Sequence, residues 1–211
     1  RQTTSPRSRM RPRHPEPEGL RAMSSSPQPG SSRGASVKAR LIVLGAGRPY
    51  RGVYPSAMVQ TSNNRRTLDW TLDAFNQVME TDVYFVGGYR IEEIVQAFPD
   101  ISFSVNPNWD SQGPLGSLLA APLSQGKTTY ICYSDIVISE DIVRSLQIVD
   151  SDVVIATDRA WQHRYEGRST EDLATAEKIR IHDGHVTELS PLISLDKTDA
   201  EFVGIMKLSP R

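Results

Sequence analysis

One aliphatic run that ends in a glycine turn constrains the fold of this chain more than any other feature. Residues 40–44 read Arg-Leu-Ile-Val-Leu, and Gly45-Ala46-Gly47-Arg48 follows at once. An unbroken aliphatic run is typical of a parallel strand that is buried on both faces. A second apolar run, 129–133, stops in the same way at Ser134-Asp135. The two runs predict an α/β protein with a parallel sheet.

Strand and helix patterns alternate between and around these two runs. Strands are expected at 40–44, 82–86, 101–105, 129–133 and 152–156, and helices at 68–79, 91–98, 115–121 and 139–149. This alternation implies right-handed crossovers and a three-layer sandwich around a mostly parallel central sheet. Farther on, 178–182 and 185–189 flank Asp183-Gly184, which predicts a C-terminal β-hairpin, and 201–208 makes a last strand.

Composition divides the chain into a tail and one domain. Residues 1–37 are rich in Ser, Pro and Arg and poor in aliphatic residues, so we expect a disordered basic tail, followed by a single domain over 38–211. The tail leaves open a nucleic-acid arm, a targeting segment, a solvated linker or a start upstream of Met10 or Met23. The rest of the chain is acidic, which disfavours a nucleic-acid partner. No apolar run reaches membrane-spanning length.

The single cysteine, Cys132, excludes an internal disulfide and fits a reducing, cytoplasmic location. It lies within an apolar strand pattern, which predicts a buried and inert thiol.

The predicted sheet would gather the polar motifs at one edge, because ligands of open parallel sheets bind at the carboxyl ends of the strands. A glycine turn lets backbone N–H groups approach a triphosphate, and Arg48 beside it can bind phosphate oxygens. Asp135 can hold the Mg²⁺ that such a phosphate carries. Taken singly, the turn could be structural and Asp135 a helix cap. Neither GxGxxG nor a P-loop motif is present.

A series of motifs resembles a known family. It comprises the glycine turn with its arginine, Leu68-Asp69-Trp70 before an amphipathic helix, Val86-Gly87-Gly88-Tyr89, Val105-Asn106-Pro107, Gly113-Pro114-Leu115-Gly116-Ser117-Leu118 and Ser134-Asp135. The series resembles the nucleotidyltransferase superfamily that makes sugar nucleotides and CDP-choline, over residues 38–209. Within it, 55–58, 64–70 and 200–204 are most similar to the phosphonate cytidylyltransferases, which are sometimes fused to a phosphoenolpyruvate mutase.

The resemblance implies a Rossmann-like, GT-A-like nucleotidyltransferase fold and transfer of CMP from CTP to a small phosphonate, with release of pyrophosphate. Hydroxyethyl- and aminoethylphosphonate are the expected acceptors. Mg²⁺ is the implied cofactor, with Asp135 as its ligand and as a catalytic residue together with Arg48 and Lys178. The implied nucleotide-binding residues are Leu44, Gly45, Ala46, Gly47, Arg48, Gly88, Asn106, Gly113 and Ser117. The resemblance leaves a fused mutase domain and a homodimer open.

An acceptor dianion needs cations, and a group of basic and aromatic residues follows the predicted metal-binding strand. The expected acceptor-binding residues are Trp161, Arg164, Tyr165, Arg168 and Lys178. The same residues also fit a solvated helix face with two aromatic residues at its rim. His163 is expected to be an exposed loop residue rather than a base, because a phosphonate oxygen needs no deprotonation near neutral pH.

Two departures from the family pattern matter for catalysis. Most relatives carry a lysine where this chain has Ser56, so either Arg51, Arg65 or Arg66 supplies the missing cation or catalysis is weakened. The family also has a second metal-binding aspartate after its last strand, and Asp196 and Asp199 are poor substitutes for it. We therefore expect a domain that is truncated at its C-terminus.

Three functions stay open. The first is phosphonate cytidylyl transfer, and the second is nucleotidyl transfer to a sugar 1-phosphate or phosphocholine. The third is a non-catalytic nucleotide-sensing module, in which Ser56 and the missing aspartate mark lost activity.

Overall fold

The computed structural model describes residues 38–49, 52–123 and 126–210. The predicted disordered tail and Arg51 fall outside these ranges. The strands are β1 (Ala39–Leu44), β2 (Thr81–Gly87), β3 (Ser102–Val105), β4 (Thr129–Tyr133), β5 (Val153–Asp158), β6 (Lys178–His182), β7 (His185–Leu189) and β8 (Ala200–Leu208). The helices are η1 (Ser56–Met58), η2 (Ser62–Asn64), α1 (Thr67–Asn76), α2 (Ile91–Ala97), α3 (Pro114–Leu119), α4 (Glu140–Ile148), η3 (Trp161–Tyr165), α5 (Thr170–Thr175) and η4 (Leu195–Lys197).

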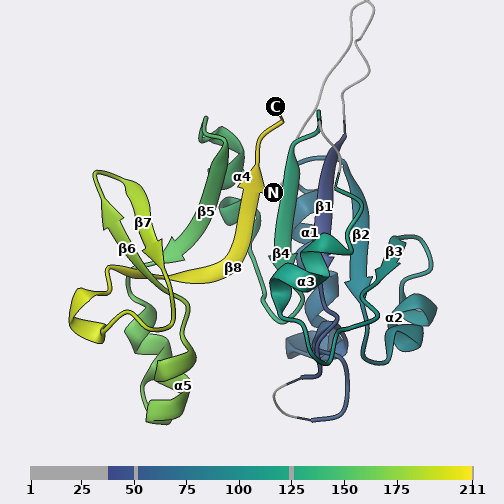
Figure 1. The fold of residues 1–211 in the computed structure, drawn as a ribbon. Helices are drawn as coiled ribbons and strands as arrows, with labels where there is room; N and C mark the ends of the chain where they lie inside the picture. The colour runs from purple at the N-terminus through teal and green to yellow at the C-terminus, as the bar shows by residue number, and fades with distance from the viewer. Residues whose placement is uncertain (1–37, 50–51, 124–125, 211) are drawn as a thin grey trace, which may run out of the picture. The chain divides into compact units, whose positions relative to one another are not determined.

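The eight strands form one mixed sheet in the order β3-β2-β1-β4-β8-β6-β7, with β5 also paired to β8 (Figure 1). The neighbours β3, β2, β1 and β4 all run parallel, which confirms the parallel sheet predicted for the first half of the domain. The predicted hairpin is present as the antiparallel pair β6–β7, with Asp183 and Gly184 at its turn in positive-φ conformations.

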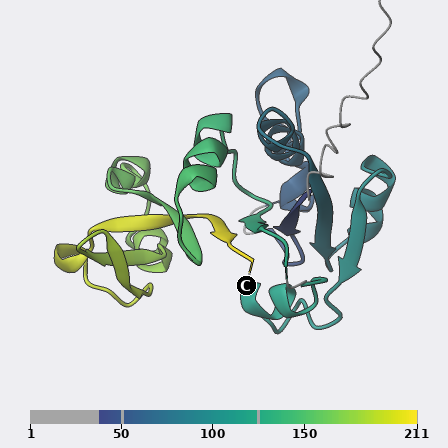
Figure 2. The same ribbon diagram turned by 90° about the horizontal axis from the view of Figure 1, so that it is seen from above.

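The long strand β8 changes the expected arrangement of the second half. It lies between β4 and β5 and is antiparallel to both, so β5 does not extend the parallel sheet next to β4 as the simple alternation suggested. Figure 2 shows β8, in yellow, running from the β6–β7 region to the parallel strands. Because β4 and β5 are both antiparallel to β8, they point the same way, and their carboxyl ends still face one edge of the sheet.

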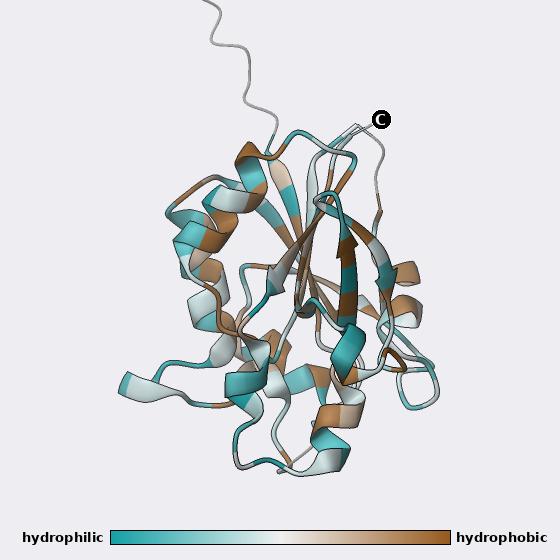
Figure 3. Ribbon diagram, turned by 90° about the vertical axis from the view of Figure 1, so that its left-hand side faces the viewer, coloured by the Kyte–Doolittle hydropathy of each residue, from teal (hydrophilic) through white to brown (hydrophobic). Residues whose placement is uncertain are grey.

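Helices cover the two faces of the sheet unequally. Alternate residues of β1 serve different faces: Leu41 and Val43 pack with α1, α2 and α4, whereas Ile42 and Leu44 pack with α3. Hydrophobic residues accordingly gather on the central strands and on the sheet-facing sides of the helices (Figure 3). This is the three-layer order that the sequence predicts. Within the described ranges, no helix has the length and apolarity needed to cross a membrane.

Candidate nucleotide-binding site

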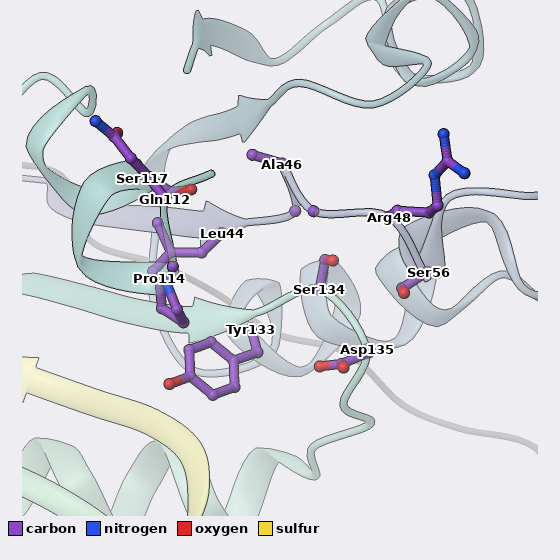
Figure 4. A pocket seen from close by; sticks show the side chains of 13 residues that line it. Leu44, Ala46, Arg48, Ser56, Gln112, Pro114, Ser117, Tyr133, Ser134 and Asp135 are labelled. Carbon is purple, nitrogen blue, oxygen red and sulfur yellow. The ribbon is translucent and has the colours of Figure 1, made fainter. Parts of the chain in front are cut away.

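A cavity of about 260 Å³ lies at the carboxyl ends of β1 and β4 (Figure 4). The turn after β1, the start of α3 and the segment after β4 enclose it. Its lining residues are Leu44, Gly45, Ala46, Gly47, Arg48, Ser56, Gln112, Gly113, Pro114, Ser117, Tyr133, Ser134 and Asp135. The structure therefore brings the glycine turn and Asp135, which are about ninety residues apart in the sequence, into the wall of one cavity.

The glycine turn is held close to its neighbours by backbone hydrogen bonds. Gly45 donates its N–H to the carbonyl of Val86 over 3.0 Å, and Ser134 donates to the carbonyl of Leu44 over 3.0 Å. A Cβ atom on Gly45 would lie 2.2 Å from Cζ of Phe85 and 2.8 Å from Oγ of Ser134, so only glycine fits there. By contrast, a Cβ on Gly47 would meet nothing within 4 Å.

Gly88 and Asn106, two of the predicted nucleotide-binding residues, do not line the cavity. Asn106 is buried and donates through Nδ2 to Oγ of Ser117 over 3.2 Å, so it orients a lining residue from behind. Gly88 lies under Trp109, where a Cβ would come within 2.5 Å of the indole. Both residues shape the loops around the cavity.

Arg48 lies at the edge of the cavity with its guanidinium on an aromatic ring. Its Cζ is 5.1 Å from the ring centroid of Tyr89, and Figure 4 shows the side chain directed away from Asp135. Ser56 lines the cavity nearby. Of the suggested replacement cations, Arg65 pairs with Asp73, and Arg66 forms an ion pair of 2.8 Å with Asp69. Neither Arg65 nor Arg66 lines the cavity.

Asp135 lines two neighbouring cavities. It follows β4, is exposed, and also borders a second space of about 500 Å³ that Asp158 and Arg164 line. The carboxylate thus lies between the glycine turn and the segment after β5. No group of three or more His, Cys, Asp or Glu residues in the described ranges could form a complete metal site.

Four of the five predicted acceptor-binding residues cluster around the buried carboxylate of Glu201. Arg164 pairs with Glu201 and, through Nε, with Oδ2 of Asp158 at 2.9 Å. The Tyr165 hydroxyl donates to Glu201 over 2.5 Å, and burial followed by this bond raises the pKa of Tyr165 to about 12. Trp161 is buried, and its ring packs edge-to-face against the ring of Tyr165. The guanidinium of Arg168 lies 5.0 Å from the Tyr165 ring centroid.

Lys178 is buried on β6 and is the sheet partner of Glu201 on β8, but its amine contacts other groups. Its amine donates to the backbone carbonyl of Pro191 over 2.6 Å and to that of Ala174 over 3.3 Å. The side chain lines neither of the two cavities that Asp135 borders. These two hydrogen bonds connect β6 to the segments that contain Ala174 and Pro191.

Three residues without a predicted role belong to the site: Gln112, Tyr133 and Glu177. The Tyr133 hydroxyl donates to Oε1 of Glu177 over 3.1 Å, and burial is the main reason why the pKa of Glu177 is raised. Tyr133 is the last residue of β4, and that place at the carboxyl end of the strand, just before Asp135, was the available signal. Glu177 has no comparable signal, since its partner is 44 residues away.

The predicted burial of Cys132 and the predicted exposure of His163 agree with the structure. Cys132 is fully buried, and burial raises the pKa of its thiol to about 12, so the thiol is inert at neutral pH. The side chain of His163 is 80% exposed, and its Nδ1 lies 2.8 Å from Oε1 of Glu166.

Comparison with known proteins supports the fold assignment. No family model and no curated protein matches the sequence. Solved structures do match: the inositol-1-phosphate CTP transferase from T. maritima has a TM-score of 0.60 at 12% identity, over 82% of this chain and 71% of the other. CTP:phosphocholine cytidylyltransferase from Streptococcus pneumoniae has a TM-score of 0.57 at 14% identity, over 82% and 72%.

A third similar structure is a Bacillus anthracis protein assigned as a glucose-1-phosphate thymidylyltransferase, with a TM-score of 0.61 at 13% identity, over 81% of this chain and 71% of that one. At these identities the comparisons establish shared architecture and leave the substrate open. The chain has the fold of nucleotidyltransferases.

Proposed function

We propose that this protein transfers the CMP group of CTP to a small phosphonate or phosphate acceptor and releases pyrophosphate. The observation that carries the proposal is the shared wall of the 260 Å³ cavity, in which the glycine turn, Arg48 and Asp135 meet. Two of the similar structures are CTP-dependent transferases, which favours CTP as the donor. The finer assignment to a phosphonate acceptor rests on the sequence motifs.

In the proposed reaction, an acceptor oxygen forms a bond to the α-phosphorus of CTP while the bond from that phosphorus to the bridging oxygen of pyrophosphate breaks. The backbone N–H groups of the glycine turn and the guanidinium of Arg48 would bind the leaving phosphates. Asp135 would hold Mg²⁺, which neutralises charge on the triphosphate when it is bound. Because transfer needs positioning rather than a covalent intermediate, no nucleophilic side chain is required.

The cytosine base of CTP would lie at the α3 side of the cavity. Gln112, Gly113 and Ser117 line that side, and the buried Asn106 fixes the Ser117 hydroxyl. The acceptor would approach Asp135 from the segment after β5, where Arg164 and Arg168 lie. Arg164 already pairs with two carboxylates, so a dianion would have to share it with Asp158 and Glu201. Arg168, whose partner is a ring, is the freer of these two cations.

A pyrophosphate-release assay tests the proposal. CTP, Mg²⁺ and each of hydroxyethylphosphonate, aminoethylphosphonate, phosphocholine and glucose 1-phosphate are supplied to the full chain. We expect release that needs both CTP and a phosphonate. Asp135→Asn should slow it by a factor of about 10² or more, whereas Asp100→Asn, at an exposed acid that lines neither cavity, should leave it unchanged.

Other outcomes of the assay distinguish the alternatives. Release with glucose 1-phosphate or phosphocholine alone would assign the sugar-phosphate or choline activity. Binding of CTP without release from any acceptor would contradict the proposal and favour a nucleotide-sensing module, with Ser56 in place of a cation as the physical reason.

A further inference from the structure

Tyr133 forms part of the wall of two different cavities. One is the 260 Å³ cavity of the candidate site, and the other is an apolar space of about 170 Å³ between α3 and β8. Both are lined by Leu44, Pro114 and Tyr133, so these three side chains form the partition between them. In Figure 4, Pro114 and Tyr133 face each other across the left side of the site.

The apolar cavity has no charged lining residue. Its walls are Leu44, Pro114, Leu115, Leu118, Ile131, Tyr133, Phe202, Gly204 and Met206. Such a lining suits hydrocarbon and disfavours a phosphate or a hydroxylated sugar, because a polar group buried there would lose its hydrogen bonds to water. A ligand that reached this space from the candidate site would have to be apolar at that end.

Three contacts fix the Tyr133 ring in the partition. Its hydroxyl donates to Glu177, and its ring stands edge-on to Phe202 at 80°, with the centroids 5.9 Å apart. Gly204, on β8, leaves room for it, since a Cβ there would lie 2.8 Å from Cδ2 of Tyr133. Gly204 also has a φ of +84°, which favours glycine. The neighbouring strand is therefore shaped around this ring.

We propose that Tyr133 limits the size of the acceptor by closing the passage from the candidate site to the apolar cavity. The inference rests on the proposed function, because it places the phosphonate group of the acceptor beside Asp135, on the β5 side of the site, with its substituent directed toward Tyr133. The wild-type protein would then accept phosphonates with short substituents and reject those with longer alkyl chains. A smaller residue at position 133 would join the two cavities and admit an alkyl chain into the apolar space.

A series of n-alkylphosphonates from ethyl to hexyl tests the proposal, since each member offers the same nucleophilic oxygen. In the wild type, kcat/KM should fall as the chain lengthens. In Tyr133→Ala and in the milder Tyr133→Val, the ratio of kcat/KM for hexyl- over ethylphosphonate should rise by at least about tenfold, because one methylene in an apolar pocket is worth roughly 10- to 200-fold. Equal ratios in folded variants and wild type would overturn the proposal.

Tyr84→Ala is the matched control. Tyr84 packs against the same sheet face and lines neither cavity, so its removal should leave the ratio unchanged. Tyr133→Phe keeps the ring and loses only the bond to Glu177, and it should keep most of the wild-type preference. A Tyr133→Phe variant as permissive as Tyr133→Ala would show that the partition is not steric.

Calorimetry of hexylphosphonate binding, with CTP absent, separates this inference from the proposed function. Hexylphosphonate should bind Tyr133→Val at least about tenfold more tightly than the wild type, whether or not turnover occurs. If the wild type releases no pyrophosphate with any acceptor and this gain in binding is seen, the proposed function fails and the partition stands. If binding is equal in the two proteins, the partition is wrong.

Discussion

The hydroxyl of Tyr89 donates a hydrogen bond to the backbone carbonyl of Val53 over 3.2 Å. The same residue donates its N–H to the carbonyl of Ala46 over 2.9 Å, and its ring lies beneath the guanidinium of Arg48. Arg90 also donates to Val53, over 2.7 Å. Tyr89 therefore contacts the segment after β1 at three points on both sides of Arg48, which fixes the residue proposed to bind the leaving phosphates.

Loss of the Tyr89 hydroxyl should weaken nucleotide binding. A neutral hydrogen bond contributes about 0.5–1.5 kcal/mol net, so Tyr89→Phe should raise KM for CTP roughly two- to tenfold with a smaller change in kcat. Tyr84→Phe, on β2, which ends two residues before Tyr89, is the control. Steady-state kinetics with varied CTP give both parameters. An unchanged KM in Tyr89→Phe would show that Val53 is held without this bond.

Alanine should destabilise the protein at one glycine of the turn and have little effect on stability at the other. Gly45→Ala places a methyl group against Phe85 and Ser134, and overpacking of this kind costs about 1–3 kcal/mol. Gly47→Ala meets open space and should stay within about 0.5 kcal/mol of the wild type. Urea unfolding of both variants measures the difference. Equal stabilities would mean that the turn can move away from Phe85.

Glu177 should make the protein less stable as pH rises. Burial raises the pKa of Glu177 above its ordinary 4.5, so the folded state keeps a proton that the unfolded state has lost. The contribution of Glu177 to the unfolding free energy therefore declines from pH 4.5 up through the folded pKa and is constant beyond it. Glu177→Gln should gain stability relative to the wild type across that window.

Denaturant unfolding at several pH values measures this gain, with the exposed Glu92→Gln as the control. The advantage of Glu177→Gln should be absent below pH 4.5 and grow with pH. A constant difference between Glu177→Gln and the wild type would contradict the role of burial at this carboxylate.

Alanine variants of Arg164 and Arg168 should differ in which property they change, protein stability or the KM for the acceptor. Arg164→Ala leaves the buried carboxylate of Glu201 with Tyr165 alone and should cost about 1–3 kcal/mol of stability. Arg168 is exposed, so Arg168→Ala loses only a solvent-accessible contact with the Tyr165 ring and should cost about 0.5–1 kcal/mol. Arg168→Ala should instead raise KM for the acceptor, and an unchanged acceptor KM in that variant would exclude Arg168 from the site.

The parallel half of the fold was predictable because its signals are local. The aliphatic runs at β1 and β4 exclude amphipathic alternation, and the turns after them mark where each strand ends. The glycine turn and Asp135 could be placed together because parallel strands share a carboxyl edge. The insertion of β8 between β4 and β5 had no local signal, since its pairings join residues 43 to 79 positions apart.

The limits of prediction at the site have a similar cause. Lys178 and Arg164 are both basic residues in polar surroundings, and the sequence does not reveal that one donates to backbone carbonyls and the other pairs with Glu201. Trp161 was expected beside the acceptor, yet it is 1% exposed and supports Tyr165 from behind. These roles depend on tertiary contacts that no spacing rule encodes.

Phosphorus NMR of the products tests the central claim most directly. CTP, Mg²⁺ and a phosphonate acceptor are incubated with the wild type and with Asp135→Asn. The account predicts that the wild type forms a pair of coupled resonances from a new phosphonate–phosphate anhydride, together with pyrophosphate. Asp135→Asn should be slower by a factor of about 10² or more, equivalent to about 3 kcal/mol of transition-state stabilisation. If CTP stays unreacted with the wild type, or if the wild type and Asp135→Asn form the anhydride at equal rates, the central claim is wrong.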